Sequence, residues 1–143
     1  MPALIRRTTT GRKNMSRCSE VYPELDAYLL SKAGVERDYK AEWDWTRYMI
    51  RGKLFCAVCA DGTDFALINV KCEPEFNFSV RDMFEDIGAG YYCNKEHWNS
   101  VKLTGTVPYE TVRGMCDRGY TLILNSLTKK LRAEIAAEAE TNK

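Results

Sequence analysis

The sequence predicts a single α+β domain in which helices pack on an antiparallel sheet of about five strands. Two observations predict this fold class. Apolar residues recur at helical spacing over 19–34, 73–84 and 107–127. Between the first two segments, over 36–72, the period changes to the alternation typical of strands. The length of 143 residues and the 45% hydrophobic content suit one domain with its own core.

Residues 1–18 differ from the rest of the chain in charge. They contain five basic and no acidic residues and carry +5, whereas the whole chain carries +1, so residues 19–143 carry −4. Because this segment has no hydrophobic period, we expect a flexible basic arm that could follow a nucleic-acid backbone. The alternative, which we favour, is that Met15 is the true start and residues 1–14 do not belong to the native protein.

The first predicted helix runs from Ser19 to Gly34. Ser19 is the expected N-cap, Pro23 lies in the first turn, where proline is tolerated, and Gly34 is a natural stop. The expected buried face consists of Val21, Leu25, Tyr28 and Leu29.

Three strands of an antiparallel meander follow, over residues 45–51, 53–60 and 64–71. Gly52 separates the first two, and the pair Asp61-Gly62, a strong hairpin signal, separates the second from the third. In the third strand, Asn69 and Lys71 lie at the end of an otherwise apolar face. If the sheet curls, we expect both side chains to point toward the segment 94–99.

The six cysteines raise the question of a metal or redox site. Cys56 and Cys59 form a C-x-x-C pair, but both lie inside a predicted strand, where an offset of three directs them to opposite faces. No second C-x-x-C or H-x-x-x-H completes a zinc site. We therefore expect no metal and no cofactor, and buried, reduced thiols in a cytoplasmic protein. The chain also lacks an apolar run of membrane-spanning length, so no membrane partner is expected.

The second helix is predicted over 73–84, with Pro74 at its first position. Its expected inward residues are Phe76, Val80, Met83 and Phe84.

The third helix follows Val107-Pro108, and we expect Gly119 to allow a close approach to the sheet. The basic run 129–132 is expected near the C-terminus of this helix, where positive charge suits the helix dipole. The domain then covers 19–132, and residues 133–143 form a fraying helical tail.

The segment Asn94-Lys-Glu-His-Trp-Asn99 is a polar and aromatic corner between short strands predicted at 91–93 and 100–103. In a structural interpretation Trp98 fills the core, and Asn94 and Asn99 cap turns. In a functional interpretation the lysine, the histidine and the asparagines of the corner line a site for an anion or a base. The residue types favour the structural interpretation, because Asn and His at turns usually serve the turn.

Four motifs carry a family resemblance. The run 94–101 resembles the NK-x-HWN-(S/T)-V run of the MmcQ/YjbR-like family of small bacterial proteins, and 69–75 resembles its N-(L/V)-K-C-(D/E)-P-E junction. Residues 89–92 resemble the lead-in PGYH, with alanine for proline and tyrosine for histidine. Residues 127–132 resemble the closing LPKKLR, with threonine for proline. The resemblance covers residues from about 20 to about 132.

The resemblance implies a frataxin-like (CyaY-like) α+β fold in a double-wing arrangement, and DNA binding. We therefore expect a non-enzymatic binding protein, a monomer, with DNA as its partner. The lysines would hold phosphate, the asparagines and the histidine would hydrogen-bond, and the tryptophan would stack or anchor. The candidate residues are Lys71, Asn94, Lys95, His97, Trp98, Asn99, Lys129 and Lys130.

The charge of −4 over residues 19–143 counts against DNA binding, which usually needs a strongly basic face. The alternative is a small-molecule or protein-interaction module that uses the corner Asn94–Asn99 as a pocket. Catalysis is not expected, because the sequence lacks a nucleophile motif, a phosphate-binding glycine loop and a metal-ligand cluster. Frataxin-like iron binding has little support, since the first helix offers only Glu20, Glu24 and Asp26.

Overall fold

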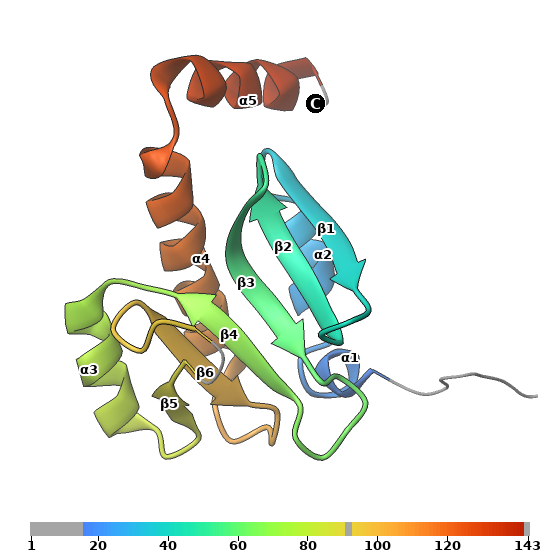
Figure 1. Ribbon diagram of the computed structural model, residues 1–143, viewed down its shortest axis with the longest axis vertical. Helices are drawn as coiled ribbons and strands as arrows, with labels where there is room; N and C mark the ends of the chain where they lie inside the picture. The colour runs from blue at the N-terminus through green and yellow to red at the C-terminus, as the bar shows by residue number, and fades with distance from the viewer. Residues whose placement is uncertain (1–15, 91–92, 142–143) are drawn as a thin grey trace, which may run out of the picture.

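A computed structural model describes residues 16–90 and 93–141 of the chain (Figure 1). The helices and strands, in chain order, are α1 (Arg17–Val21), α2 (Leu25–Leu30), β1 (Val35–Lys40), β2 (Trp45–Ile50), β3 (Lys53–Cys59), β4 (Leu67–Lys71), α3 (Pro74–Met83), β5 (Ile87–Ala89), β6 (Trp98–Lys102), α4 (Tyr109–Ser126) and α5 (Lys129–Thr141). The described strands form one antiparallel, 6-stranded sheet in the order β1-β2-β3-β4-β6-β5. The α+β class is thus confirmed, with one strand more than expected.

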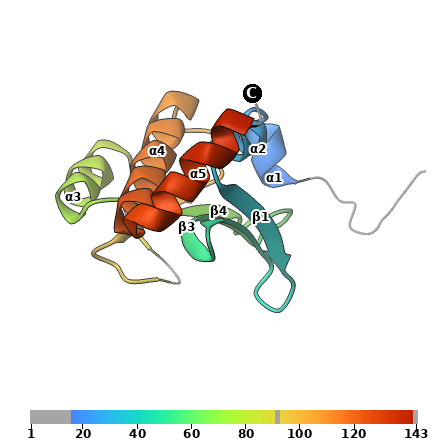
Figure 2. The same cartoon turned by 90° about the horizontal axis from the view of Figure 1, so that it is seen from above.

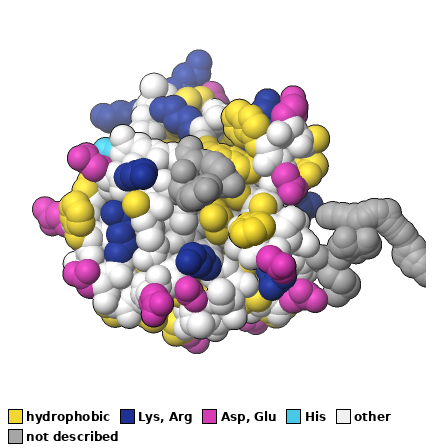
Figure 3. All heavy atoms as spheres, turned by 60° about the horizontal axis from the view of Figure 1, so that its bottom comes forward, with side chains coloured by type: hydrophobic (Ala, Val, Ile, Leu, Met, Phe, Trp, Pro, Cys, Tyr) yellow, Lys and Arg dark blue, Asp and Glu magenta, His cyan; other side chains and the backbone are white. Residues whose placement is uncertain are grey.

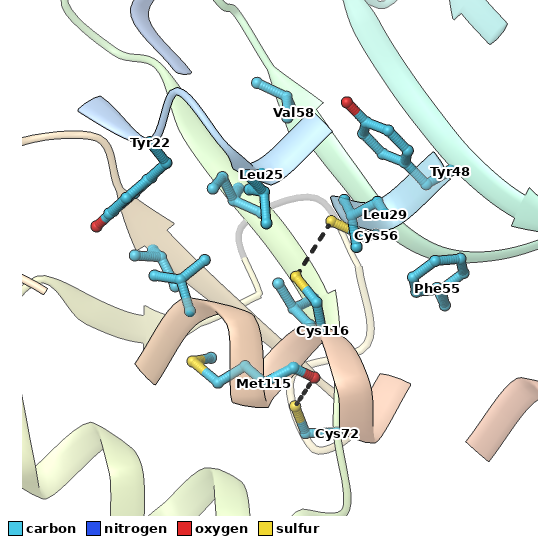
Figure 4. Packing of buried hydrophobic residues seen from close by; sticks show 14 of the residues in the cluster. Tyr22, Leu25, Leu29, Tyr48, Phe55, Cys56, Val58, Cys72, Met115 and Cys116 are labelled. Carbon is cyan, nitrogen blue, oxygen red and sulfur yellow. Dashed lines mark hydrogen bonds between the residues drawn. The ribbon is translucent and has the colours of Figure 1, made fainter. Parts of the chain in front are cut away.

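The helices gather on one side of the sheet, as the view from above in Figure 2 shows. Helix α4 packs against β3 and β4, α2 against β1, and α3 against β5 and β6. The main hydrophobic core lies under these helices, and Figure 4 shows its centre. Among the described residues no helix covers the opposite side of the sheet (Figures 1 and 2). The sheet therefore has a helix-covered face and a helix-free face.

Helix α4 lies close to the sheet at Gly119, as the sequence predicted. A Cβ atom added at Gly119 would lie 2.6 Å from the carbonyl oxygen of Lys71 and 3.2 Å from that of Phe55. Real Cβ atoms do not approach backbone atoms this closely, so any other residue would push the helix away from β3 and β4.

The single helix predicted from Ser19 to Gly34 is wrong, because two short helices occupy this segment. Ser16, rather than Ser19, caps the first of them: its side chain accepts a hydrogen bond from the Ser19 N–H at 3.1 Å. Pro23 lies between α1 and α2. Proline has no N–H to donate, and its ring clashes with the preceding helical turn, so a helix that begins before Ser19 cannot continue through it.

The hairpin between β2 and β3 turns at Arg51-Gly52, as predicted from the glycine. Both residues have positive φ, 49° and 81°, as a two-residue turn of type I′ requires. The loop at Asp61-Gly62 is longer than predicted, so β4 begins only at Leu67. The predicted strand 91–93 is not supported at Cys93, which lies outside any strand, and its first two residues lie outside the described part of the chain. The strand before the corner is β5.

The basic run after α4 begins a new helix instead of ending the third one. Lys129 and Lys130 form the first turn of α5, where the helix dipole disfavours positive charge. Arg132 does place positive charge at the C-terminal end of α4, as expected. Its guanidinium donates to the carbonyl oxygens of Leu127 at 2.6 Å and Asn125 at 3.3 Å. These contacts stabilise the C-terminal end of α4.

The tail that we expected to fray is helical to Thr141, and α5 is docked on the domain. The side chain of Ile135 is only 2% exposed, and its Cγ2 lies 3.0 Å from the Cβ position of Gly34. Arg51, in the β2–β3 turn, forms an ion pair of 2.7 Å with Glu138. Helix α5 thereby spans from the end of α4 to the β2–β3 hairpin (Figure 1).

Candidate functional site

The corner begins with a turn that Asn94 stabilises. Its side-chain Oδ1 accepts hydrogen bonds from the backbone N–H groups of Glu96 at 2.9 Å and His97 at 3.2 Å. The carbonyl oxygen of His97 in turn accepts a hydrogen bond from the N–H of Cys72 at 3.1 Å. The amide oxygen of Asn94 therefore serves the turn, as the structural interpretation expected.

Asn99 belongs to a buried chain of side-chain amides between β6 and α3. Its Nδ2 donates to Oδ1 of Asn77 at 2.5 Å. The Nδ2 of Asn77 donates to the carbonyl oxygens of Cys72 at 3.1 Å and Glu96 at 2.8 Å. Both asparagines are buried, so each hydrogen bond compensates for lost contact with water.

Arg81, on α3, completes this network. Its Nε donates to Oδ1 of Asn99 at 2.7 Å, and its Nη2 donates to the carbonyl oxygens of Lys95 at 2.5 Å and Trp98 at 2.9 Å. Partial burial lowers the pKa of Arg81, although the guanidinium stays charged at neutral pH. The polar atoms of Asn99 are thus bonded within the protein, and this side chain is not available to a ligand.

Helix α3 has its predicted orientation except at Met83. Val80 is buried and Phe84 packs on the core as expected, but Met83 is 70% exposed. The position that we missed is Asn77, which is buried and lies four residues before Arg81, on the same side of the helix. This spacing of two polar residues is the signal that could have identified the network.

All three tryptophans of the chain lie on the helix-free face of the sheet. Trp45 packs there with Ala57 and Cys59 in a small cluster separate from the main core. Trp43 is 54% exposed, with its ring centre 5.2 Å from that of Trp45. Trp98 is only partly buried, so the expectation that it fills the core is wrong.

Basic side chains lie beside these rings. The Nζ of Lys40 is 4.9 Å and the Cζ of Arg47 is 6.0 Å from the ring centre of Trp43. The Nζ of Lys71 is 5.6 Å from the ring centre of Trp98, which confirms the expected approach of Lys71 to the corner. At these distances the cations are attracted to the π faces of the rings.

The charges of this face are only partly neutralised. Arg47 is paired with Asp38 at 2.5 Å, and Lys40 is 4.0 Å from Glu42. Lys71 and Lys102, which lies opposite Leu67 in the sheet register, have no ion pair among the described residues. Figure 3 shows basic, acidic and hydrophobic side chains intermixed on the surface turned to the viewer.

The structure brings together only some of the predicted residues. Lys71 and Trp98 share the helix-free face, whereas Asn99 points to α3 and Asn94 serves its turn. Lys129 and Lys130 begin α5 at the far end of α4 from the corner (Figure 1). The additional residues of the face are Trp43, Trp45, Lys40, Arg47 and Lys102, which sequence reasoning missed because strand register is needed to place them together.

Within residues 16–90 and 93–141, no group of three or more His, Cys, Asp or Glu side chains could hold a metal ion. None of the helices in the same ranges is long and apolar enough to cross a membrane.

The fold and its exposed aromatic face define a small α+β protein whose candidate site is a sheet surface. Residues 30–122 match the model of the YjbR family, so the chain belongs to the YjbR family. It is 27% identical over 109 residues to Escherichia coli YjbR, covering 76% of this chain and 92% of that protein. Bacillus subtilis YyaQ is 34% identical over 56 residues, which cover 39% of this chain and 47% of YyaQ.

Solved structures support the fold. The crystal structure of Deinococcus radiodurans protein DR2400, a DUF419 domain, matches with a TM-score of 0.72 at 22% identity, over 80% of this chain and 86% of that one. A Pseudomonas syringae protein matches with a TM-score of 0.60 at 19% identity, over 71% of this chain and 97% of the other. At these identities the likeness concerns the fold alone.

Proposed function

We propose that this protein is a non-enzymatic nucleic-acid-binding protein and that the helix-free face of the sheet is its binding surface. The observation that carries the proposal is the position of Trp43, Trp45 and Trp98 on one face beside Lys71 and other cations. The DNA binding that the family resemblance implies points in the same direction.

The chemistry of the face suits an unpaired strand better than a duplex. A base stacks on an aromatic ring regardless of its sequence, but only if its own π face is free. Trp43 is 54% exposed and Trp98 is partly exposed, so both rings are accessible to a base. Lys71 and Lys102, which have no ion pair among the described residues, would hold the phosphates between the stacked bases.

The acidic balance of the folded part limits the expected affinity. Residues 19–143 carry −4, so few phosphates can be neutralised and stacking must supply a large share of the binding energy. We therefore expect binding in the micromolar range with a moderate dependence on salt.

A small-molecule site at the corner is less well supported, because Asn94 and Asn99 are bonded within the protein. If a small ligand binds, the better place is a cleft of about 730 Å³ lined by α1, α2, β1 and β2. Its volume lies in the range of ligand pockets. Asp26 and Tyr48 line it, but they already form a hydrogen bond of 2.7 Å with each other.

The test is fluorescence anisotropy of labelled random single-stranded and duplex DNA, titrated with the full chain at about 50 and about 200 mM salt. Single strands should bind more tightly than duplex. Trp43→Ala should weaken single-strand binding about tenfold, since base stacking contributes about 1–3 kcal/mol.

The matched control changes the same number of charges elsewhere. Lys71→Glu with Lys102→Glu and Lys129→Glu with Lys130→Glu alter the net charge equally, but only the first pair lies on the proposed face. The basic arm is present in both variants, so it does not affect the comparison. Equal losses of affinity in the two double variants would show that the binding site does not lie on this face. If neither DNA form binds at low salt, the proposal is overturned.

A further inference from the structure

The sheet separates two pairs of neighbouring thiols, one on each face. Cys56 and Cys59 point to opposite faces, as the sequence predicted, and each lies near a different cysteine. On the helix-covered face the Sγ of Cys56 lies 3.9 Å from that of Cys116 on α4 (Figure 4). On the helix-free face Cys59 packs in the same small cluster as Cys93.

The second pair is arranged around one amide group. The Nδ2 of Asn69 is 3.6 Å from the Sγ of Cys59 and 4.0 Å from the Sγ of Cys93. The Oδ1 of Asn69 accepts a hydrogen bond of 2.5 Å from the Oγ of Ser100, which fixes the amide with its nitrogen toward the sulfur atoms. Both sulfur atoms therefore lie against one buried, oriented group.

Cys93 and Cys59 differ in their exposure to solvent and in whether their backbone belongs to a strand. Cys93 is the one cysteine of the chain that is not buried, whereas Cys59 is buried and is held at the end of β3 by its pairing with β2 and β4. Partial burial raises the pKa of the Cys93 thiol, and the positive charge of Lys71 acts in the opposite direction. Cys93 lies in a bend outside the strands, so the hydrogen-bond ladder of the sheet does not fix its backbone.

We propose that Cys93 and Cys59 form an oxidisable thiol pair that a hydroperoxide converts to a disulfide. The Cys93 thiolate attacks the peroxide, the O–O bond breaks, and Cys93 becomes a sulfenic acid while an alcohol or water leaves. The sulfur of Cys59 then attacks the sulfur of Cys93, the S–S bond forms, and one water leaves with the proton of Cys59. Two thiols lose two electrons in total, and the peroxide gains them.

This disulfide would attach the segment before the corner to β3 across the helix-free face. The bond would form beside Asn69, in the cluster that contains Trp45. Cys56 and Cys116 should stay reduced although their sulfur atoms are close, because both are buried and an oxidant does not reach either of them. Access, and not proximity alone, decides which pair reacts. The inference is independent of nucleic-acid binding.

The test uses the full chain, treated with hydrogen peroxide, alkylated with iodoacetamide and digested with trypsin without reduction. Cys59 lies in tryptic peptide 54–71, Cys93 in 82–95 and Cys116 in 114–118. We expect peptide 54–71, carrying one carbamidomethyl group on Cys56, joined through Cys59 to peptide 82–95. Its mass should be two hydrogen atoms less than the sum of peptide 82–95 and the singly alkylated peptide 54–71. Cys56→Ala should keep this product, and Cys59→Ala should abolish it. Oxidation should also be faster at higher pH, where more of Cys93 is thiolate.

Three results would overturn the inference. One is a cross-link of 54–71 to 114–118 in place of 82–95, which would mean that the buried pair reacts. Another is Cys93 found only as a sulfenic or sulfinic acid, and the third is a cross-link that survives Cys59→Ala. The wild-type digest alone distinguishes the first two, so the test does not depend on the folding of a variant.

Discussion

The two faces of the sheet are made by alternate residues of the same strands, yet they differ in what covers them. On one face α4 lies against β3 and β4, with Gly119 at the backbone of Lys71, and the contact is apolar and close. On the other face Leu67 and Cys93 pack against Trp45 and Cys59, and the ring of Trp43 lies beside that of Trp45. The difference teaches that the packed helices bury one face in the main core, whereas the helix-free face keeps Trp43 and Lys102 exposed.

Raising the pH is expected to destabilise the protein through buried groups on the helix-covered face. Of the changes considered, this one should lower the free energy of unfolding most. Burial raises the pKa of Cys18 and Tyr22 to about 12, and burial also raises the pKa values of Tyr48 and Cys72. These groups keep their protons in the folded state to higher pH than in the unfolded chain. Stability should therefore be complete below about pH 8.5 and decrease as the pH rises toward 12.

Each such group lowers the free energy of unfolding by about 1.4 kcal/mol per pH unit between its two pKa values. Urea unfolding at about pH 7, 9 and 10.5, with the absorbance of tyrosinate recorded in parallel, measures the effect. Tyrosines that all ionise at their ordinary pKa before the protein unfolds would show that this face is open to water.

Gly119→Ala should destabilise the protein by about 3 kcal/mol, because the new methyl group would collide with the backbone of the sheet. Gly114→Ala is the matched control in the same helix. A Cβ at Gly114 meets nothing within 4 Å, so this variant should gain about 0.5–1 kcal/mol from helix propensity. The urea unfolding midpoints of both variants check the prediction. It fails if the two substitutions change the stability in the same direction.

Asn99→Ala should cost about 1–3 kcal/mol, because Asn77 and Arg81 each lose a buried hydrogen-bond partner. Asn94→Ala, in an exposed turn, should cost only about 0.5 kcal/mol. Thermal unfolding distinguishes the two. If Asn99→Ala leaves stability unchanged and instead reduces DNA binding, Asn99 belongs to the binding surface and the distinction between the faces is less strict than described.

Local rules predicted the parts of the fold that depend on neighbouring residues. The α+β class, the turn at Gly52 and the opposite directions of Cys56 and Cys59 follow from periodicity and turn chemistry. The close approach at Gly119 was also predictable, because a glycine within an apolar helix face is otherwise unfavourable.

The candidate site was less predictable, because it depends on strand order. The run from Asn94 to Asn99 reads as one site, but Trp98 points to the helix-free face and its neighbour Asn99 to α3. Trp43 and Trp98 share a face only because β4 lies next to β6, a pairing that no local pattern specifies. The docking of Ile135 against Gly34 depends on an equally distant contact.

The position of α5 has a consequence for how the chain folds as it is synthesised. Ile135 and Glu138 contact Gly34 and Arg51, residues that leave the ribosome long before α5 does. The contacts of α5 with Gly34 and with the β2–β3 hairpin can therefore form only after α5 has emerged. A nascent chain stalled before residue 135 would leave the surface around Gly34, which Ile135 covers in the folded protein, exposed to chaperones.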